Sequence, residues 1–236
     1  MPIPTIAVYT HTGLIPANLI QAWVAAAQIA LTRDFAPHWS DAKLVYVPPG
    51  GTIEPDWWQL VYFDHSDQAG ALGYHDVTPS GLPLGKVFIQ DCLDDKENWN
   101  VTSLHETYEM IADPDIIQTV TMTDMSGITW EYAREVCDAP EDDRFGVRVG
   151  GHLASNAVTP SWFDPSGKPP FTIYPCVEIN APFTLASGGY IGRRQLPNGE
   201  WQQQFARIAG PRQVKRETSR TMFRFRRDLV LPAATP

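Results

Sequence analysis

Residues 103–114 read SLHETYEMIADP, and we predict that they form a helix carrying the motif H-E-x-x-E. Side chains four residues apart lie one above the other on a helix of 3.6 residues per turn. His105 and Glu109 could therefore bind one metal ion together. Glu106 lies about 100° further round the helix, beside such an ion, where a metal-dependent hydrolase has its general base. Asp113, one turn further on, is a candidate for a further ligand.

The sequence also marks the ends of this predicted helix and its burial. Thr102 or Ser103 can cap its first turn, and Pro114 stops it. The residues between the acidic ones are mostly apolar, which indicates a buried helix. Buried carboxylates are costly unless they are paired, and the nearest basic residues in the sequence are Lys96 and Arg134. A bound cation is the favoured solution, and arginine partners are the alternative.

A second group of acidic residues could supply the remaining ligands. Glu135 and Asp138 come 26 and 29 residues after Glu109 and flank an apolar Val-Cys pair, which indicates a buried segment. Catalytic zinc sites use three protein ligands and keep an open position, so one or both of these carboxylates are candidate metal ligands. The thiol of Cys137 is a weaker candidate. Residues 141–143 are also acidic, but they predict an exposed turn.

The patterns S-x-H-E-x-x-E-M-x-x-D-P and E-V-C-D together resemble the zincin-like fold of metallopeptidases, in a variant whose second histidine is glutamate. Plant exordium-like secreted proteins and a group of uncharacterised bacterial and phage-borne proteins carry a similar pairing. The resemblance to the second group spans roughly residues 5 to 192 and includes four further blocks: Leu72–His75, Lys86–Phe88, Pro160–Asp164 and Gly188–Tyr190. It implies a zincin-like fold and a metal site more strongly than a particular reaction.

The expected cofactor is a divalent metal ion. Zinc is the first choice, and the replacement of histidine by carboxylate makes calcium or manganese the alternatives. His75, which follows Gly73-Tyr74, could reach the cleft and bind substrate or stabilise an oxyanion. Tyr190 follows two glycines, which allow a close backbone approach, so it is a second candidate for substrate binding. The default interpretations are a hydrogen-bonded loop histidine and a tyrosine packed in the core.

Length and composition predict one globular domain. The chain has 236 residues, of which 43% are hydrophobic, and this is enough for one sizeable core. We expect no membrane span, because the sequence has no run of 18 apolar residues. The first residues lack the features of a signal peptide, so synthesis in the cytoplasm is expected. The three widely spaced cysteines (Cys92, Cys137 and Cys176) are expected to be reduced and mostly buried.

The order of the elements predicts an α+β, zincin-like fold. A strand at residues 6–9, an amphipathic helix at 17–35, and strands at 43–47, 57–63 and 86–90 would form an N-terminal mixed sheet with a backing helix. The metal-site helix would follow the last strand directly, and in the zincin fold this strand borders the substrate cleft. The second half is predicted to be rich in loops and hairpins. Its short elements are expected at 147–152, 160–162, 171–174 and 189–191, followed by a hairpin at 196–201 whose Asn-Gly pair suits a type I′ turn.

Charge divides the chain near residue 205. Residues 205–236 hold eight Lys and Arg against two acidic residues, a net charge of +6, whereas residues 1–204 carry −15. We therefore predict a zincin-like domain over 1–204 and a basic C-terminal arm over 205–236. Apolar and charged residues alternate at 221–231, as in an edge strand. Such an arm favours a protein partner or a homo-oligomer over nucleic acid, which the acidic domain would repel, and a solvated tail is the alternative.

Two functions fit these observations. The leading hypothesis is a metal-dependent hydrolase, and specifically a zincin-like peptidase that acts on a peptide or protein substrate. The alternative is a structural or assembly protein, such as a phage virion component, that keeps the same scaffold with a structural ion or with none. Motifs of serine hydrolases and of nucleotide-binding loops are absent from the sequence, which argues against those classes.

The basic arm leads to a prediction about assembly. If residues 205–236 bind the acidic surface of a neighbouring copy, assemblies of the full chain should weaken as salt rises from about 0.05 to 0.5 M, because the Debye length shortens. Light scattering of the full chain and of a chain shortened to residues 1–204 would measure this. Identical monomeric masses for both chains at both salt concentrations would contradict the assembly role.

Overall fold

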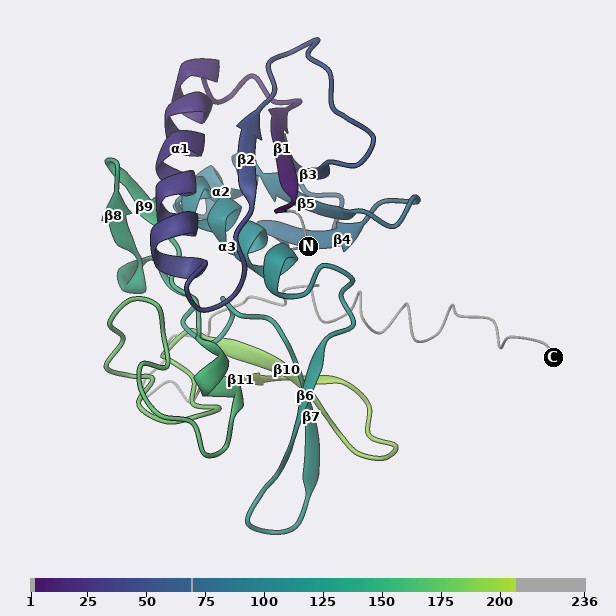
Figure 1. Cartoon of the computed structure of the whole chain (residues 1–236), viewed down its shortest axis with the longest axis vertical. Coiled ribbons are helices and arrows are strands. Elements are labelled where there is room, and N and C mark those ends of the chain that lie inside the picture. Colours follow the sequence, from purple (N-terminus) through teal and green to yellow (C-terminus); the bar gives the residue numbers. More distant parts are fainter. Residues whose placement is uncertain (1–2, 69, 207–236) are drawn as a thin grey trace, which may run out of the picture.

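The computed structural model describes residues 3–68 and 70–206, which form an α+β fold (Figure 1). A five-stranded mixed sheet with its helices makes up one half, and a four-stranded antiparallel sheet with long loops makes up the other, while the β8–β9 hairpin lies beside α1. No helix in the described ranges is long and apolar enough to cross a membrane. Nearly all of the expected basic arm, including the strand expected at 221–231, lies outside the described residues. Strand β11 (Gln202–Phe205) runs across the expected domain boundary at residue 205.

The large sheet has the strand order β2-β1-β3-β5-β4. Its first four strands are parallel, and β4 pairs with β5 in the antiparallel direction at one edge. The strands are β1 (Thr5–Thr10), β2 (Lys43–Tyr46), β3 (Trp58–Phe63), β4 (Gly73–Val77) and β5 (Pro83–Phe88). The predicted mixed sheet is confirmed, but β4 was not predicted, because its residues suggested a loop.

The path from the sheet to the helix that carries the H-E-x-x-E motif differs from the expectation. Strand β5 ends at Phe88, and Ile89 begins the short helix α2 (Ile89–Asp94). Helix α3 (Trp99–Ala112) therefore does not follow the last strand directly. Strand β4 lies at the edge of the sheet and contacts α3. The last strand before α3 in the chain is β5, which lies inside the sheet.

Helix α1 (Ala17–Ala30) continues through a π-helical turn, Leu31–Phe35, over the whole range predicted from the sequence. It lies beside α3 on one face of the sheet (Figure 1). Aromatic pairs join the two helices. The rings of Phe35 and Tyr108 stack with their centres 4.1 Å apart, and those of Trp23 and Trp99 lie 5.8 Å apart. These large side chains, of which Trp99 is partly exposed and the other three are buried, fix the position of α3 against α1.

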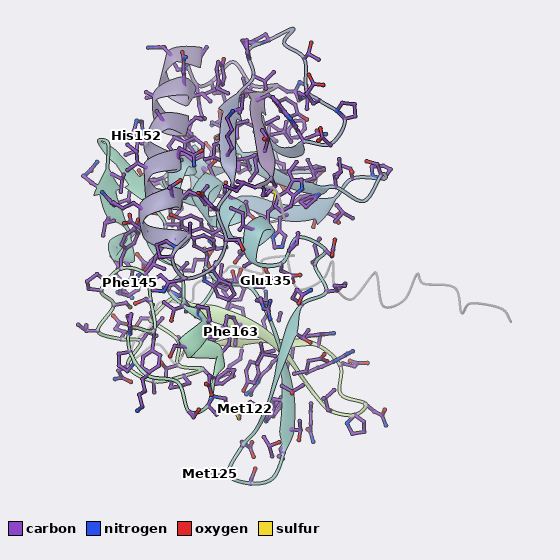
Figure 2. The ribbon with its side chains drawn as sticks, in the orientation of Figure 1. Met122, Met125, Glu135, Phe145, His152 and Phe163 are labelled. Atoms are coloured by element: carbon purple, nitrogen blue, oxygen red, sulfur yellow. The ribbon has the colours of Figure 1, made fainter. Side chains whose placement is uncertain are left out.

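The second half contains a four-stranded antiparallel sheet of order β11-β10-β7-β6 and a separate hairpin. Strands β6 (Thr119–Thr123) and β7 (Thr129–Ala133) form a long hairpin whose tip carries the fully exposed Met125 (Figure 2). The remaining strands are β8 (Val147–Val149), β9 (His152–Ala154) and β10 (Tyr190–Gln195). The predicted loop- and hairpin-rich character is confirmed, although the β6–β7 hairpin was not predicted.

Three local expectations in this half are wrong. Residues Pro160–Phe163 form a 3₁₀ helix, since proline favours the first turn of a helix. Residues 171–174 make only a single bridge, from Thr172 to Val158, because prolines on both sides interrupt a ladder. The Asn198-Gly199 pair does not form a type I′ turn, because neither residue has a positive φ.

Gly73, the first residue of β4, allows the edge strand to approach α3 closely. A Cβ atom at this position would lie 2.8 Å from Glu106 Oε1, 2.8 Å from the methyl group of Thr102 and 2.9 Å from the carbonyl oxygen of Lys86. The glutamate oxygen ends a flexible side chain and could shift, but the carbonyl oxygen belongs to the backbone. Only glycine therefore fits without displacing either β4 or α3.

We expect Gly73→Ala to lower the free energy of unfolding by about 1–3 kcal/mol, the usual cost of an extra methyl group in a packed site. Gly13→Ala is the matched control, since a Cβ atom at Gly13 would meet nothing within 4 Å. Urea denaturation of both variants would measure the difference. Equal stability of Gly73→Ala and the parent would show that β4 can move away from the helix at little cost.

Candidate metal centre

Helix α3 begins earlier than the sequence indicated. Its N-cap is Asn98, in place of Thr102 or Ser103. Ser103 is fully buried inside the helix, and its hydroxyl group lies 2.8 Å from the hydroxyl group of Tyr62 on β3. Ser103 therefore does not cap the helix and instead connects it to the sheet through Tyr62. His105, Glu106 and Glu109 therefore lie inside α3, away from its N-terminus.

Asp113 is the C-cap of α3, just ahead of Pro114 as expected. Its carboxylate accepts hydrogen bonds from the backbone N–H groups of Ile117, at 3.0 Å, and Gln118, at 2.9 Å. This side chain therefore orders the turn that leads to β6. Neither group of potential metal ligands among the described residues includes Asp113, so its role as a further ligand stays a prediction.

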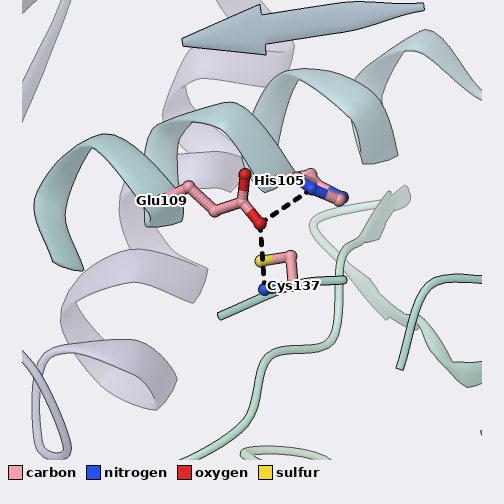
Figure 3. Close-up of side chains that lie close together, drawn as sticks. All are labelled: His105, Glu109 and Cys137. Carbon is pink, nitrogen blue, oxygen red and sulfur yellow. Dashed lines mark hydrogen bonds and ion pairs between the residues drawn. The ribbon is translucent and has the colours of Figure 1, made fainter. Parts of the chain in front are cut away.

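The helical spacing brings His105 and Glu109 together as the motif predicts. Nε2 of His105 lies 3.0 Å from Oε1 of Glu109, as Figure 3 shows, and 3.3 Å from Oδ1 of Asp138. All three side chains are almost completely buried. Two ligands of a tetrahedral zinc ion, each at about 2.0–2.1 Å from it, lie about 3.3 Å apart. The observed separations therefore match those between ligands that share one ion.

Residues 134–139 form an irregular segment after β7 that carries the second part of the site. Its backbone N–H at Cys137 donates to Oε1 of Glu109 at 3.2 Å. Its carbonyl groups accept hydrogen bonds from three distant residues: Val158 at 2.7 Å, Tyr190 at 3.1 Å and Ala186 at 3.0 Å. These bonds fix the segment before any ligand binds, so the carboxylates of Glu135 and Asp138 are held by backbone contacts to separate parts of the second half.

Cys137 lies within the first group of potential ligands. Its sulfur, an Nε2 or Nδ1 atom of His105 and an oxygen of Glu109 all lie within 4.8 Å of one another (Figure 3). Burial raises the pKa of the Cys137 thiol well above its usual range, and the nearby carboxylates of Glu109 and Asp138 raise it further. The thiol is therefore neutral in the metal-free site, and a bound cation would favour the thiolate. All three cysteines are free and buried, as predicted.

His75 belongs to a strand and not to a loop, which corrects the default interpretation of its role. Residues two apart on a strand point to the same face, so His75 faces α3 together with Gly73. Nδ1 of His75 lies 3.5 Å from Oε2 of Glu109 and 3.7 Å from Oε2 of Glu106, and its Nε2 lies 3.8 Å from Oε2 of Glu135. The pattern Gly-x-His, read as a strand, would have indicated this position.

Two opposing effects act on the pKa of His75. Burial lowers it, but the carboxylates of Glu135, Glu106 and Glu109 outweigh burial and raise the pKa well above 6.5. The metal-free site therefore favours a protonated imidazole at neutral pH. A bound cation would take the place of that proton.

The structure separates the two carboxylates, Glu135 and Asp138, of which the sequence offered one or both as ligands. Asp138 lies beside His105, whereas Glu135 lies beside His75. Glu135 is found where the sheet half meets the β6–β7 hairpin (Figure 2). Two groups of side chains could thus each hold a metal ion: His105 with Glu109 and Cys137, and His75 with Glu109 and Glu135.

Tyr190, a candidate for substrate binding, is fully buried on β10. Its ring centre lies 5.7 Å from that of Phe205, and its backbone N–H donates to the carbonyl oxygen of Asp138. The described contacts place Tyr190 in the core and give it a part in positioning the segment that carries Asp138.

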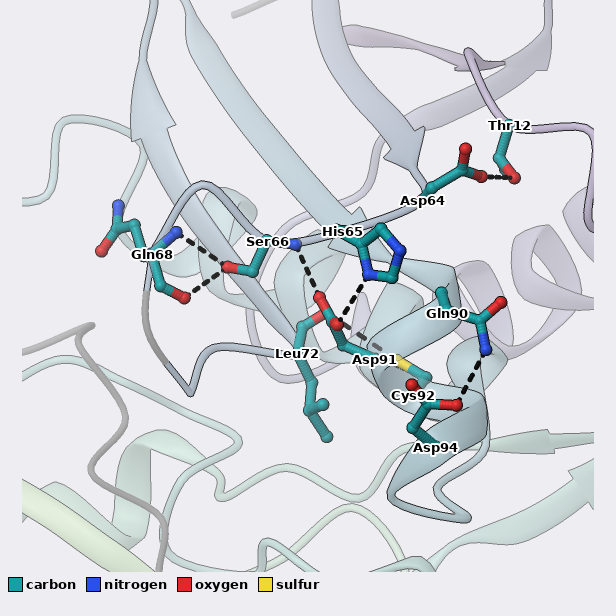
Figure 4. Close-up of polar contacts among 10 residues, drawn as sticks. All are labelled: Thr12, Asp64, His65, Ser66, Gln68, Leu72, Gln90, Asp91, Cys92 and Asp94. Atoms are coloured by element: carbon teal, nitrogen blue, oxygen red, sulfur yellow. Dashed lines mark hydrogen bonds and ion pairs between the residues drawn. The ribbon is translucent and has the colours of Figure 1, made fainter.

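A separate hollow of about 420 Å³ lies beside α2 and is lined by His65, Ser66, Gln68, Gly70, Ala71, Leu72, Asp91, Asp94 and Asp95. Asp91 holds the loop between β3 and β4, as Figure 4 shows: it accepts from the backbone N–H of Ser66 at 2.6 Å and pairs with His65 at 3.2 Å. Cys92 contacts the carbonyl oxygen of Leu72 at 3.8 Å. Helix α2 therefore fixes the start of β4, and through it the position of His75.

The chain matches no protein-family model, and comparisons with curated proteins and with solved structures found no match.

We expect zinc to stabilise the parent protein and not Glu109→Ala, because Glu109 belongs to both groups of potential ligands. A ligand at a hundredfold excess over its Kd adds about 2.7 kcal/mol, or on the order of 5–10 °C in Tm for a chain of this size. Thermal melts with zinc and with chelator would measure the increment, and the exposed Glu54→Ala is the control. The same increment in parent and Glu109→Ala would remove Glu109 from the site.

Proposed function

We propose that this chain is a metal-dependent hydrolase of the zincin-like type, and specifically a peptidase. The observation that carries the proposal is the arrangement of His105 and Glu109 on α3, with Asp138 arriving from a downstream segment at 3.3 Å from His105. The mixed sheet, with an antiparallel edge strand beside the motif helix, supports the zincin-like assignment.

The donor set fits a divalent cation, with zinc as first choice. The imidazole of His105 and the nearby thiol of Cys137 favour zinc, while the carboxylates of Glu109 and Asp138 also suit manganese or calcium. A bound cation would polarise the scissile carbonyl group and lower the pKa of a coordinated water towards about 7.

Glu106 is the proposed general base. It follows His105 on α3, is fully buried, and has one oxygen 3.7 Å from Nδ1 of His75. In the proposed reaction its carboxylate accepts a proton from the attacking water and passes it to the leaving amine. Gly73 and His75 on β4 flank this carboxylate, so the edge strand sets its orientation.

One observation favours a second candidate, in which the ion is structural. His75, His105, Glu106, Glu109, Glu135 and Asp138 are each at most 6% exposed. Structural metal sites are closed, whereas catalytic sites keep a position open to substrate. In that case the protein would serve assembly, for example in a phage virion, with a protein partner or a second copy bound through residues 205–236.

The variant Glu106→Gln separates the two candidates. Loss of the general base should lower peptidase activity by about 10²–10⁴-fold, while the metal content stays that of the parent, because Glu106 belongs to neither group of potential ligands. Hydrolysis of a peptide library and metal analysis of the same samples would measure both quantities. Glu54→Gln, at an exposed position, is the control.

Retained hydrolysis in Glu106→Gln would exclude the proposed mechanism. A parent protein that binds metal but hydrolyses no peptide would favour the structural candidate.

A further inference from the structure

We propose that the centre binds two divalent cations, with the Glu109 carboxylate bridging them and with His75 and Glu135 holding the second. The first position, at His105 and Asp138, is that of the proposed function, and the inference rests on it. In this arrangement His75 becomes a metal ligand, and Glu135 binds the second ion instead of the first.

The two oxygens of Glu109 face different partners. Oε1 lies 3.0 Å from Nε2 of His105 and 3.2 Å from the backbone nitrogen of Cys137, whereas Oε2 lies 3.5 Å from Nδ1 of His75. The two groups of potential ligands share Glu109 and no other residue. A carboxylate placed between two such groups can bridge two ions about 3.5–4 Å apart, as in two-metal hydrolases.

His75 provides independent support for the second position. Its side chain is 3% exposed, and neither ring nitrogen makes a hydrogen bond within residues 3–68 and 70–206. The nearest carboxylate oxygens, at 3.5–3.8 Å, are too far for good hydrogen bonds. The contacts with Glu109 and Glu135 involve opposite nitrogens of the ring, and only one nitrogen can bind the second ion. One ring nitrogen, one oxygen of Glu109 and one oxygen of Glu135 lie within 4.8 Å of one another, and a cation bound among them would give that buried nitrogen a partner.

The local charge agrees with two cations. Four carboxylates (Glu106, Glu109, Glu135 and Asp138) lie within this buried cluster, each at most 5% exposed. One divalent cation offsets two of these charges, and two cations offset all four, with both imidazoles neutral. A second cation would therefore balance the charge of the cluster without a proton on either histidine.

A pair of cations also suits the proposed chemistry. Two-metal sites stabilise both the attacking and the leaving atoms of a displacement at a carbonyl or phosphoryl centre. His75 and Glu135 are then positioning residues for the second cation, and Glu106 remains the general base.

Manganese provides the test, because two bridged Mn²⁺ ions give a spin-coupled EPR signal that a single ion does not. The full chain, freed of metal and dialysed against MnCl₂, should bind two ions per chain and show the coupled signal. His75→Ala and Glu135→Gln should each bind one ion and lose the coupling. His152→Ala, a histidine outside both groups, should keep two ions. Circular dichroism would check that each variant is folded. If His75→Ala does not fold, the ion count and the EPR signal of Glu135→Gln alone decide the result.

One ion per chain in the parent, unchanged in His75→Ala and Glu135→Gln, would overturn the second position and leave the first intact. If the parent binds one ion, and either substitution abolishes that binding, the second position is also overturned, because His75 or Glu135 would then be a ligand of the first ion. No bound ion in the parent would remove both the inference and the proposed function.

Discussion

Burial of several carboxylates between α3 and residues 135–138 is the constraint that organises this structure. Glu106 and Glu109 are fully buried on the helix, and Glu135 and Asp138 approach them from the other side. Like charges at such distances destabilise a folded protein, so they must be compensated by protons, by cationic groups or by metal ions. The two histidines beside them are the groups that suit the last of these solutions.

The surrounding fold holds these side chains in place. Aromatic stacking between α1 and α3 fixes the helix from one side, and the glycine at the start of β4 lets the edge strand approach it from the other. Backbone hydrogen bonds from Val158 and from the stretch 186–190 hold residues 134–139. The geometry therefore depends on packed and hydrogen-bonded elements, and this is the support that a precise binding site requires.

Helical periodicity made much of this arrangement predictable from the sequence. The spacing of His105 and Glu109 required one face of a helix, and the apolar residues around Glu135 and Asp138 indicated a buried segment. Periodicity within one element could not predict contacts between elements. The role of β4 depended on its pairing with β5, and the separation of Glu135 from Asp138 depended on the path of the chain after β7. The predicted N-cap of α3 was wrong because Ser103, a residue type that favours caps, lies inside the helix and contacts Tyr62.

The β6–β7 hairpin joins the two parts of the centre and has a consequence for how the chain can vary. Its strands pair from Thr119 with Ala133 at the base to Thr123 with Thr129 near the tip. Because the two strands pair side by side, a hairpin of any length returns the chain close to the end of α3. Its tip at Met125 is fully exposed. The entropy of closing a loop grows only slowly with loop length. Insertions at this tip can therefore lengthen the hairpin, and add a new surface to the protein, while the distance between α3 and residues 135–138 is conserved.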